Sequence, residues 1–256
     1  MKQLTAFLKK EVLEQIRTGK FVIITILFCI FGIMNPAIAK LTPAMMSLLS
    51  EQLEESGLIV NDITVDASVS WQQFYKNMPI ALIIFIVLFA GILINEYQKN
   101  TLLNILTKGM SRYKIILSKT VILSILWTFG YFLSYGITYA YNAYFWDNKI
   151  LYNIGFCAFC TYFAGLWLIS LIPLASSIAK SVSIVMLTCG GAYIVSYLIS
   201  MLPKASKYMP THLMDFAPLL SGVLKSSDYI TAIIVTSVLI LFNIILSILL
   251  FNKKQI

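Results

Sequence analysis

The residue types that usually carry catalysis or metal binding are few in this sequence and widely separated. His212 is the single histidine, which excludes a metal site built on several imidazoles. Cys157 and Cys160 have the CxxC spacing of redox and zinc sites, but they lie in an apolar segment, where small buried side chains are expected. HExxH, GxSxG and GxxxxGK[ST] motifs are absent from the sequence. We therefore expect no enzyme activity, catalytic residue, cofactor or metal in this chain itself.

Charged side chains gather instead in the segment 96–114, between two apolar stretches. Glu96 follows the first stretch and Arg112 precedes the second. The residues between them predict a short amphipathic helix that Gly109 can end. Such a helix, held parallel to a membrane, could fit a groove on another protein. The alternative is a plain basic loop. The apolar face of the predicted helix consists of Leu102, Leu103, Ile105 and Leu106.

Residues 1–20 predict a second amphipathic helix. Its apolar face contains Leu4, Phe7, Leu8, Val12 and Ile16. The charged residues Lys2, Lys9, Lys10, Glu11, Glu14 and Arg17 fall mainly on the other face. A basic helix of this kind lies in the membrane interface. The alternative is a solvated helix ahead of the first span.

The elements that position these segments are predicted to be membrane helices. Hydrophobic residues make up 59% of the 256 residues and charged residues only 12%, whereas a soluble domain has about 25% charged residues. The apolar blocks are close to the roughly 20 residues that a membrane-spanning helix needs. We therefore predict an all-α polytopic membrane protein with six transmembrane helices. The predicted spans are 21–41, 78–95, 115–141, 154–175, 183–202 and 229–251.

The spans divide the chain into an interfacial helix at 1–20, a six-helix domain at 21–251 and a tail at 252–256. The predicted outer loops are 42–77, 142–153 and 203–228, and the inner loop is 96–114. Thirteen of the 19 Lys and Arg residues fall on the side of the N-terminus and six on the other side. This bias predicts a cell-membrane protein with both termini in the cytoplasm. We therefore attribute the net charge of +8 to the orientation of the chain in membrane lipid, and we expect no binding of nucleic acid.

The predicted spans contain no carboxylate in their cores, which disfavours a transporter driven by a proton gradient. Lys40 and Lys119 stand near helix ends, from which long side chains can reach the interface. Asn35 and Pro36 should kink the first span, because proline cannot make one of the helical hydrogen bonds. The kink either shapes a lateral path or is an ordinary feature of a membrane helix.

The segment 95–114 resembles the corresponding loop in the membrane subunit of ABC-2 type transporters. Those permeases carry an acidic residue after the second span, a Gly-Thr-Leu-like stretch, a short helix and a Ser-Arg pair before the third span. Asn100 stands here in place of the usual glycine, and Gly109–Met110 stand where a proline is common. The matching residues are Glu96, Thr101, Leu102, Leu103, Ser111 and Arg112.

The N-terminal segment is similar to the elbow helix of these permeases, and the stretch 31–43 is similar to bacterial members with a large first outer loop. The elbow residues would be Phe7, Lys10, Glu11 and Arg17. The resemblance implies a bacterial permease that pairs with a second, identical or different, permease chain. Each permease would engage a cytoplasmic ABC ATPase subunit that binds ATP and Mg. Coupling to that subunit would fall to Glu96, Thr101, Leu102, Leu103, Leu106, Ser111 and Arg112.

The apolar, aromatic-rich bundle favours export of an amphipathic or hydrophobic substrate, such as a peptide, a drug or a lipid-like compound. The alternative is a membrane immunity or sensor protein that does not transport and binds a ligand through its first outer loop. On the transport hypothesis, Glu96→Ala and Arg112→Ala should each uncouple ATP hydrolysis from transport with little loss of folding.

Overall fold

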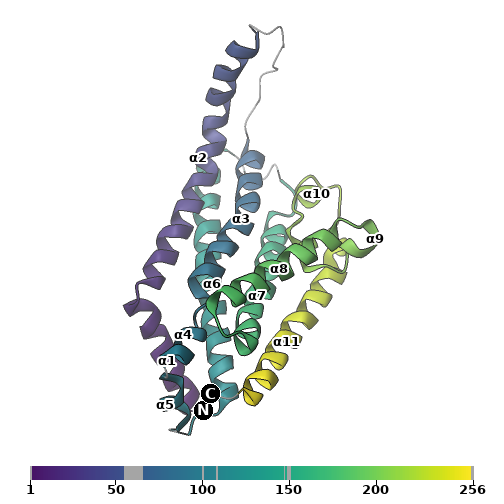
Figure 1. Ribbon diagram of the computed structural model, residues 1–256. Helices are drawn as coiled ribbons and strands as arrows, with labels where there is room; N and C mark the ends of the chain where they lie inside the picture. The colour runs from purple at the N-terminus through teal and green to yellow at the C-terminus, as the bar shows by residue number, and fades with distance from the viewer. Residues whose placement is uncertain are drawn as a thin grey trace.

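The chain forms a bundle of long helices in the computed structural model, which describes residues 2–54, 66–99, 101–107, 109–146, 148 and 151–254. No strand occurs among these residues. Both termini lie at one end of the bundle, together with α1, α4 and α5 (Figure 1). We call this the terminal end. The short helices α9 and α10 lie at the opposite end, the far end.

Six of the described helices are long and apolar enough to cross a membrane, which confirms the predicted fold class. They are α2 (Lys20–Glu54), α3 (Ala67–Phe89), α6 (Arg112–Phe145), α7 (Ile154–Ile178), α8 (Val182–Ser200) and α11 (Ile230–Lys253). The shorter elements are α1 (Lys2–Arg17), α4 (Ile94–Gln98), α5 (Thr101–Thr107), α9 (Pro203–Ser206), η2 (Pro210–Met214), α10 (Ala217–Leu220) and η3 (Ser226–Tyr229).

The segment 42–77, predicted as a loop, is largely helical where the structure describes it. Helix α2 continues to Glu54, and α3 begins at Ala67 after Asp66, whose carboxylate accepts a hydrogen bond from the Ser68 backbone N–H at 2.8 Å. Polar residues such as Glu and Gln are good helix formers, so a helix can continue into water where hydropathy alone predicts a loop. The acidic residues Glu55 and Asp62 of that prediction lie outside the described residues.

The core of the bundle is centred on α6, which packs against α2, α3, α7 and α11. Trp127 of α6 is fully buried and makes edge-to-face contacts with Phe28 of α2 and Phe85 of α3, each with ring centroids 5.8 Å apart. On the α7 side its indole lies directly over Gly165, where an added Cβ would be 2.4 Å from Trp127 Cζ2. Only glycine therefore allows α6 and α7 to approach this closely.

Gly165→Ala is expected to lower the free energy of unfolding by about 1–3 kcal/mol, because the methyl group overpacks the site of a buried indole. Denaturant titration in detergent micelles, followed by circular dichroism, measures the loss. Gly136→Ala is the matched control, because a Cβ added at Gly136 has no atom within 4 Å. Equal stability of the two variants would contradict close packing at Trp127.

Candidate functional site

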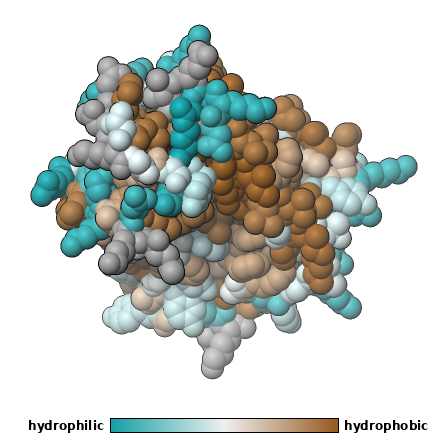
Figure 2. Space-filling view, turned by 90° about the horizontal axis from the view of Figure 1, so that it is seen from below, coloured by the Kyte–Doolittle hydropathy of each residue, from teal (hydrophilic) through white to brown (hydrophobic). Residues whose placement is uncertain are grey.

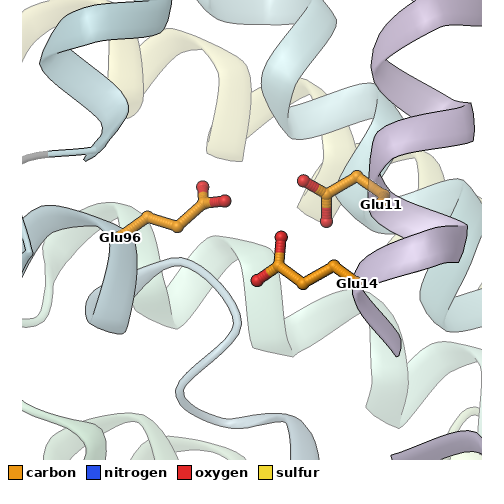
Figure 3. A group of neighbouring side chains, drawn as sticks. All are labelled: Glu11, Glu14 and Glu96. Carbon is orange, nitrogen blue, oxygen red and sulfur yellow. The ribbon is translucent and has the colours of Figure 1, made fainter. Parts of the chain in front are cut away.

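Five charged side chains meet at the terminal end of the bundle: Lys10, Glu11 and Glu14 of α1, Glu96 of α4 and Lys119 of α6. We call them the charge cluster. Helix α1 reaches the bundle because Gly19, with φ of +73°, turns the chain between α1 and α2. Figure 3 shows the carboxylates of Glu11 and Glu14 pointing from α1 toward that of Glu96.

Lys119 is the centre of the charge cluster. Its Nζ lies 2.9 and 2.8 Å from the two carboxylate oxygens of Glu11 and 2.9 Å from Glu96 Oε1. Glu11 is 0%, Lys119 1% and Glu96 5% exposed. The prediction that Lys119 reaches the membrane interface is therefore wrong, because its ammonium group points into the bundle and pairs with two buried carboxylates.

Lys10 closes the charge cluster on its exposed side. Its Nζ lies 2.6 Å from Glu14 Oε2, 2.7 Å from Glu96 Oε1 and 3.0 Å from Glu11 Oε1. Partial burial lowers the pKa of Lys10, but the hydrogen bonds to Glu14 and Glu96 and the nearby carboxylate charges outweigh it, so the pKa is raised. Burial likewise raises the pKa of Glu14, and the hydrogen bond and charge of Lys10 outweigh it and leave that pKa lowered. Both groups are therefore held in their charged forms.

The three carboxylates come close enough to suggest a metal site, with oxygens within 4.8 Å of one another. The ammonium groups of Lys10 and Lys119, however, already bind at least one oxygen of each of these three carboxylates. A divalent cation would have to displace them. The arrangement is thus a salt-bridge network that joins three helices, with a net charge of −1 from three carboxylates and two ammonium groups.

Helix α5 follows the charge cluster directly and presents two different faces. Thr101 Oγ1 donates a hydrogen bond to the backbone oxygen of Glu96 at 3.3 Å, and Leu102 is fully buried, so the start of α5 is held against the bundle. Leu103 is 42% exposed, and Leu106 is half-buried. Gly109 has φ of +81°, and its N–H donates to the Leu106 carbonyl at 2.9 Å, as expected for a helix-ending glycine. The predicted apolar face is therefore divided: Leu102 packs into the bundle, and Leu103 is exposed at the surface.

Arg112 lies away from the charge cluster and instead holds the end of α11. Its Nη1 donates hydrogen bonds to the backbone oxygens of Phe251 at 3.1 Å, Asn252 at 3.1 Å and Lys254 at 2.6 Å. The last carbonyls of a helix lack intrahelical partners and carry partial negative charge, which a guanidinium complements. Ser111 is the N-cap residue of α6 and makes no side-chain capping bond.

Lys254 binds the end of α7 in the way that Arg112 binds the end of α11. Its Nζ donates to the backbone oxygens of Ser176 at 3.1 Å and Ala179 at 2.9 Å and lies 4.2 Å from the ring centroid of Tyr97 in α4. We call Arg112 and Lys254 the C-terminal clamp. The clamp joins α4, α6, α7 and α11 at the terminal end, where Figure 2 shows hydrophilic side chains beside a broad apolar surface.

The predicted elbow residues of α1 take different positions. Phe7 and Glu11 are buried, whereas Lys10 and Arg17 are exposed. The predicted assignment of the faces is therefore wrong for Glu11, since the stripe against the bundle contains Phe7, Glu11 and Gln15. The apolar residues Val12, Leu13 and Ile16 are instead 42–52% exposed.

Asn35 and Pro36 lie inside the bundle, in a polar network that joins α2, α3 and α6. Pro36 cannot donate to the Gly32 carbonyl, and Thr138 Oγ1 donates to that oxygen at 3.0 Å. Asn35 Nδ2 donates to Thr138 Oγ1 at 3.3 Å, and Asn35 Oδ1 accepts from Asn77 Nδ2 at 2.8 Å. These bonds hold the backbone at Pro36 in place. The role of Asn35 and Pro36 in a lateral path stays a prediction.

Lys119 and Lys254 were not among the predicted site residues. For Lys119 a signal existed. It stands on the same helical stripe as Ile115, Ile116 and Leu123, which are all buried. A lysine on such a stripe needs a carboxylate partner inside the bundle. For Lys254 no comparable signal exists, because its partners are backbone oxygens and the face of a ring.

The chain is similar to known membrane proteins. The family model described as ABC-2 family transporter protein matches residues 5–256, which contain the whole charge cluster and the C-terminal clamp. The "Uncharacterized transmembrane protein YxlG" of Bacillus subtilis (strain 168) is 25% identical over 221 residues, which cover 83% of this chain and 83% of that protein. Because the family model covers nearly all of the chain, this multi-pass membrane protein belongs to the ABC-2 family of transporter proteins.

Proposed function

We propose that this chain is the permease subunit of an ABC exporter in which a separate cytoplasmic ATPase supplies the energy. Two permease chains, identical or different, would form the path for an amphipathic or hydrophobic substrate. The terminal end would face the cytoplasm, in agreement with the excess of Lys and Arg on that side. The family membership supports a transport role, and the charge cluster carries the proposal of coupling to an ATPase.

The charge cluster suits coupling because it connects an exposed docking surface with a central helix of the bundle. Helix α5 leaves Leu103 exposed and begins five residues after Glu96. Glu96 is bound to Lys119 of α6 and to Lys10 of α1. A force on α5 would therefore act on α1 and α6 together. Buried salt bridges resist separation, because an unpaired charge in the interior is costly.

Leu103→Glu is expected to weaken docking of the ATPase with little loss of stability. Leu103 is 42% exposed, so a carboxylate there stays solvated in the free permease but would be desolvated in an apolar interface. We expect the permease-stimulated ATPase activity of a co-expressed ABC ATP-binding subunit from the same genome to fall at least tenfold. The measurement is ATP hydrolysis by the co-purified complex in nanodiscs.

Leu103→Met is the matched control, since it keeps an apolar side chain of similar volume and should retain activity. Normal co-purification and normal ATPase stimulation with Leu103→Glu would remove α5 from the proposed interface. Failure of every ABC ATP-binding subunit of that genome to bind the unmodified chain would contradict the proposed exporter.

A further inference from the structure

A pocket of about 390 Å³ opens between α3, α8 and the segment 203–228. It lies toward the far end of the bundle, where α9 and α10 are found, and so at the opposite end from the charge cluster (Figure 1). Its lining mixes aromatic rings with two residues of opposite charge. The lining residues that matter here are Tyr75, Lys76, Tyr193, Tyr197, Asp215 and Phe216.

The aromatic rings of the pocket form two stacked pairs. Tyr75 of α3 is buried and stacks on Trp71 and on Phe216, with ring centroids 6.1 and 5.3 Å away. Tyr193 and Tyr197 of α8 stack with centroids 6.4 Å apart. The rings that remain partly accessible to a ligand are therefore those of Phe216, Tyr193 and Tyr197. Faces of aromatic rings attract cations, above all quaternary ammonium groups, which are weakly hydrated. Pro79 also lines the pocket and cannot donate to the backbone oxygen of Tyr75, so this acceptor lacks its usual helical partner.

The two charged residues of the lining, Lys76 and Asp215, are both exposed, and within the described part of the chain neither forms a salt bridge. His212 also lines the pocket, and burial lowers its pKa although the charge of Asp215 opposes that shift. The imidazole is therefore neutral at pH 7, and Lys76 supplies the positive charge of the lining. A ligand with both a cationic and an anionic group would find a partner for each.

An apolar cleft of about 100 Å³ adjoins the pocket and shares Pro79 and Tyr193 with it. The rest of the cleft is lined by Leu82, Ile83, Ile86, Leu168, Gly190 and Ile194. It lies between α3, α7 and α8. A Cβ added at Gly190 has no atom within 4 Å, so the absence of a side chain there leaves open space. The cleft has room for part of one alkyl chain.

We propose that the pocket and the cleft together bind a single-chain amphipath with a zwitterionic headgroup. The ammonium group lies against Asp215 and the accessible rings of Phe216, Tyr193 and Tyr197. The anionic group pairs with Lys76, and the alkyl chain enters the cleft beside Gly190. This inference rests on the proposed export function and narrows its substrate class from amphipaths in general to this headgroup chemistry.

The test is a binding measurement on the full chain in nanodiscs of phosphatidylglycerol, which lacks an ammonium group. A photo-crosslinkable lysophosphatidylcholine is the probe, and mass spectrometry maps the labelled residues. We expect labelling on α3 and α8 within the pocket and cleft. Unlabelled lysophosphatidylcholine should compete, whereas two-chain phosphatidylcholine and dodecyltrimethylammonium should compete at least tenfold less well.

Three variants test the contacts separately. Asp215→Asn and Lys76→Gln should each weaken binding about threefold to tenfold, because each removes one charged partner of the headgroup. Gly190→Leu should weaken binding at least tenfold, because its side chain fills the space assigned to the alkyl chain. Gly191→Leu is the matched control, since Gly191 also has open space at its Cβ but does not line the cleft. Lys204→Gln, on an exposed lysine outside the lining, controls for net charge.

Unchanged binding in Gly190→Leu, or equal loss in Gly191→Leu, would overturn the site. Equal competition by dodecyltrimethylammonium would overturn the zwitterionic headgroup, and equal competition by phosphatidylcholine would overturn the single chain. The assay contains no ATPase, so its outcome does not depend on the proposed docking surface of α5. If the probe binds but no ATPase partner can be found, the binding site is supported and the proposed exporter is contradicted.

Discussion

Replacing Lys119 with methionine is expected to lower the free energy of unfolding by about 3–5 kcal/mol, because the variant removes the buried counter-ion of Glu11 and leaves it only the partly exposed Lys10. Glu11 is fully buried, and the Lys119 ammonium group binds both of its carboxylate oxygens. Methionine fills nearly the same volume, so the loss reports on charge and not on a cavity. Unfolding of the chain in mixed micelles, followed by circular dichroism, gives the value.

Lys10→Met is the matched control for Lys119→Met. Lys10 touches the same carboxylates but has 42% of its side chain exposed, so solvent screens its ion pairs and its removal should cost about 1 kcal/mol or less. Adding Glu11→Gln to Lys119→Met should recover part of the stability, since the double variant buries one fewer uncompensated charge. Equal small losses in Lys119→Met and Lys10→Met would contradict the central position of Lys119.

Hydropathy and length were sufficient to predict the six membrane helices, because a span in lipid must satisfy its own backbone hydrogen bonds. The start of α7 at Ile154 coincides with the predicted start, and α11 begins one residue after the predicted span. The ends of α2 and α3 in the segment 42–77 were not predictable in this way. Outside the membrane, helix continuation depends on propensity and capping, which hydropathy does not measure.

The charge cluster was predictable only in part. Glu96, Lys10 and Glu11 were selected as site residues from the family resemblance, but as members of two separate groups. The structure brings these groups together through Lys119, which lies 108 residues from Glu11 in the sequence. One sequence cannot identify that pairing, because it does not reveal how α1 and α6 are rotated about their axes. The hydrophobic pattern predicts that apolar residues such as Leu8 and Val12 face the bundle. In the structure Glu11 is buried there, and Val12 is 43% exposed.

The partners of Arg112 could not be predicted from the sequence, for a different reason. Its guanidinium binds three backbone oxygens about 140 residues away, and every helix end presents such oxygens. A motif match identifies the arginine but not the helix that it holds. The contact also changes what is expected of Arg112→Ala, for which the sequence predicted uncoupling with little loss of folding.

Arg112→Ala is expected to cost about 2–4 kcal/mol of stability and to release the end of α11, since three carbonyls lose a charged donor. Arg112→Lys should recover only part of this, because the lysine side chain is shorter and its ammonium group does not reach the position that Nη1 holds among the three oxygens. Hydrogen exchange in nanodiscs locates the effect: the amides of α11 near Phe251 should exchange faster, whereas those of α3 should not. Uniform acceleration along the chain would mean general destabilisation, and unchanged exchange at α11 would contradict the clamp. If α11 is released while ATPase docking persists, the clamp holds α11 to α6 without contributing to the ATPase interface.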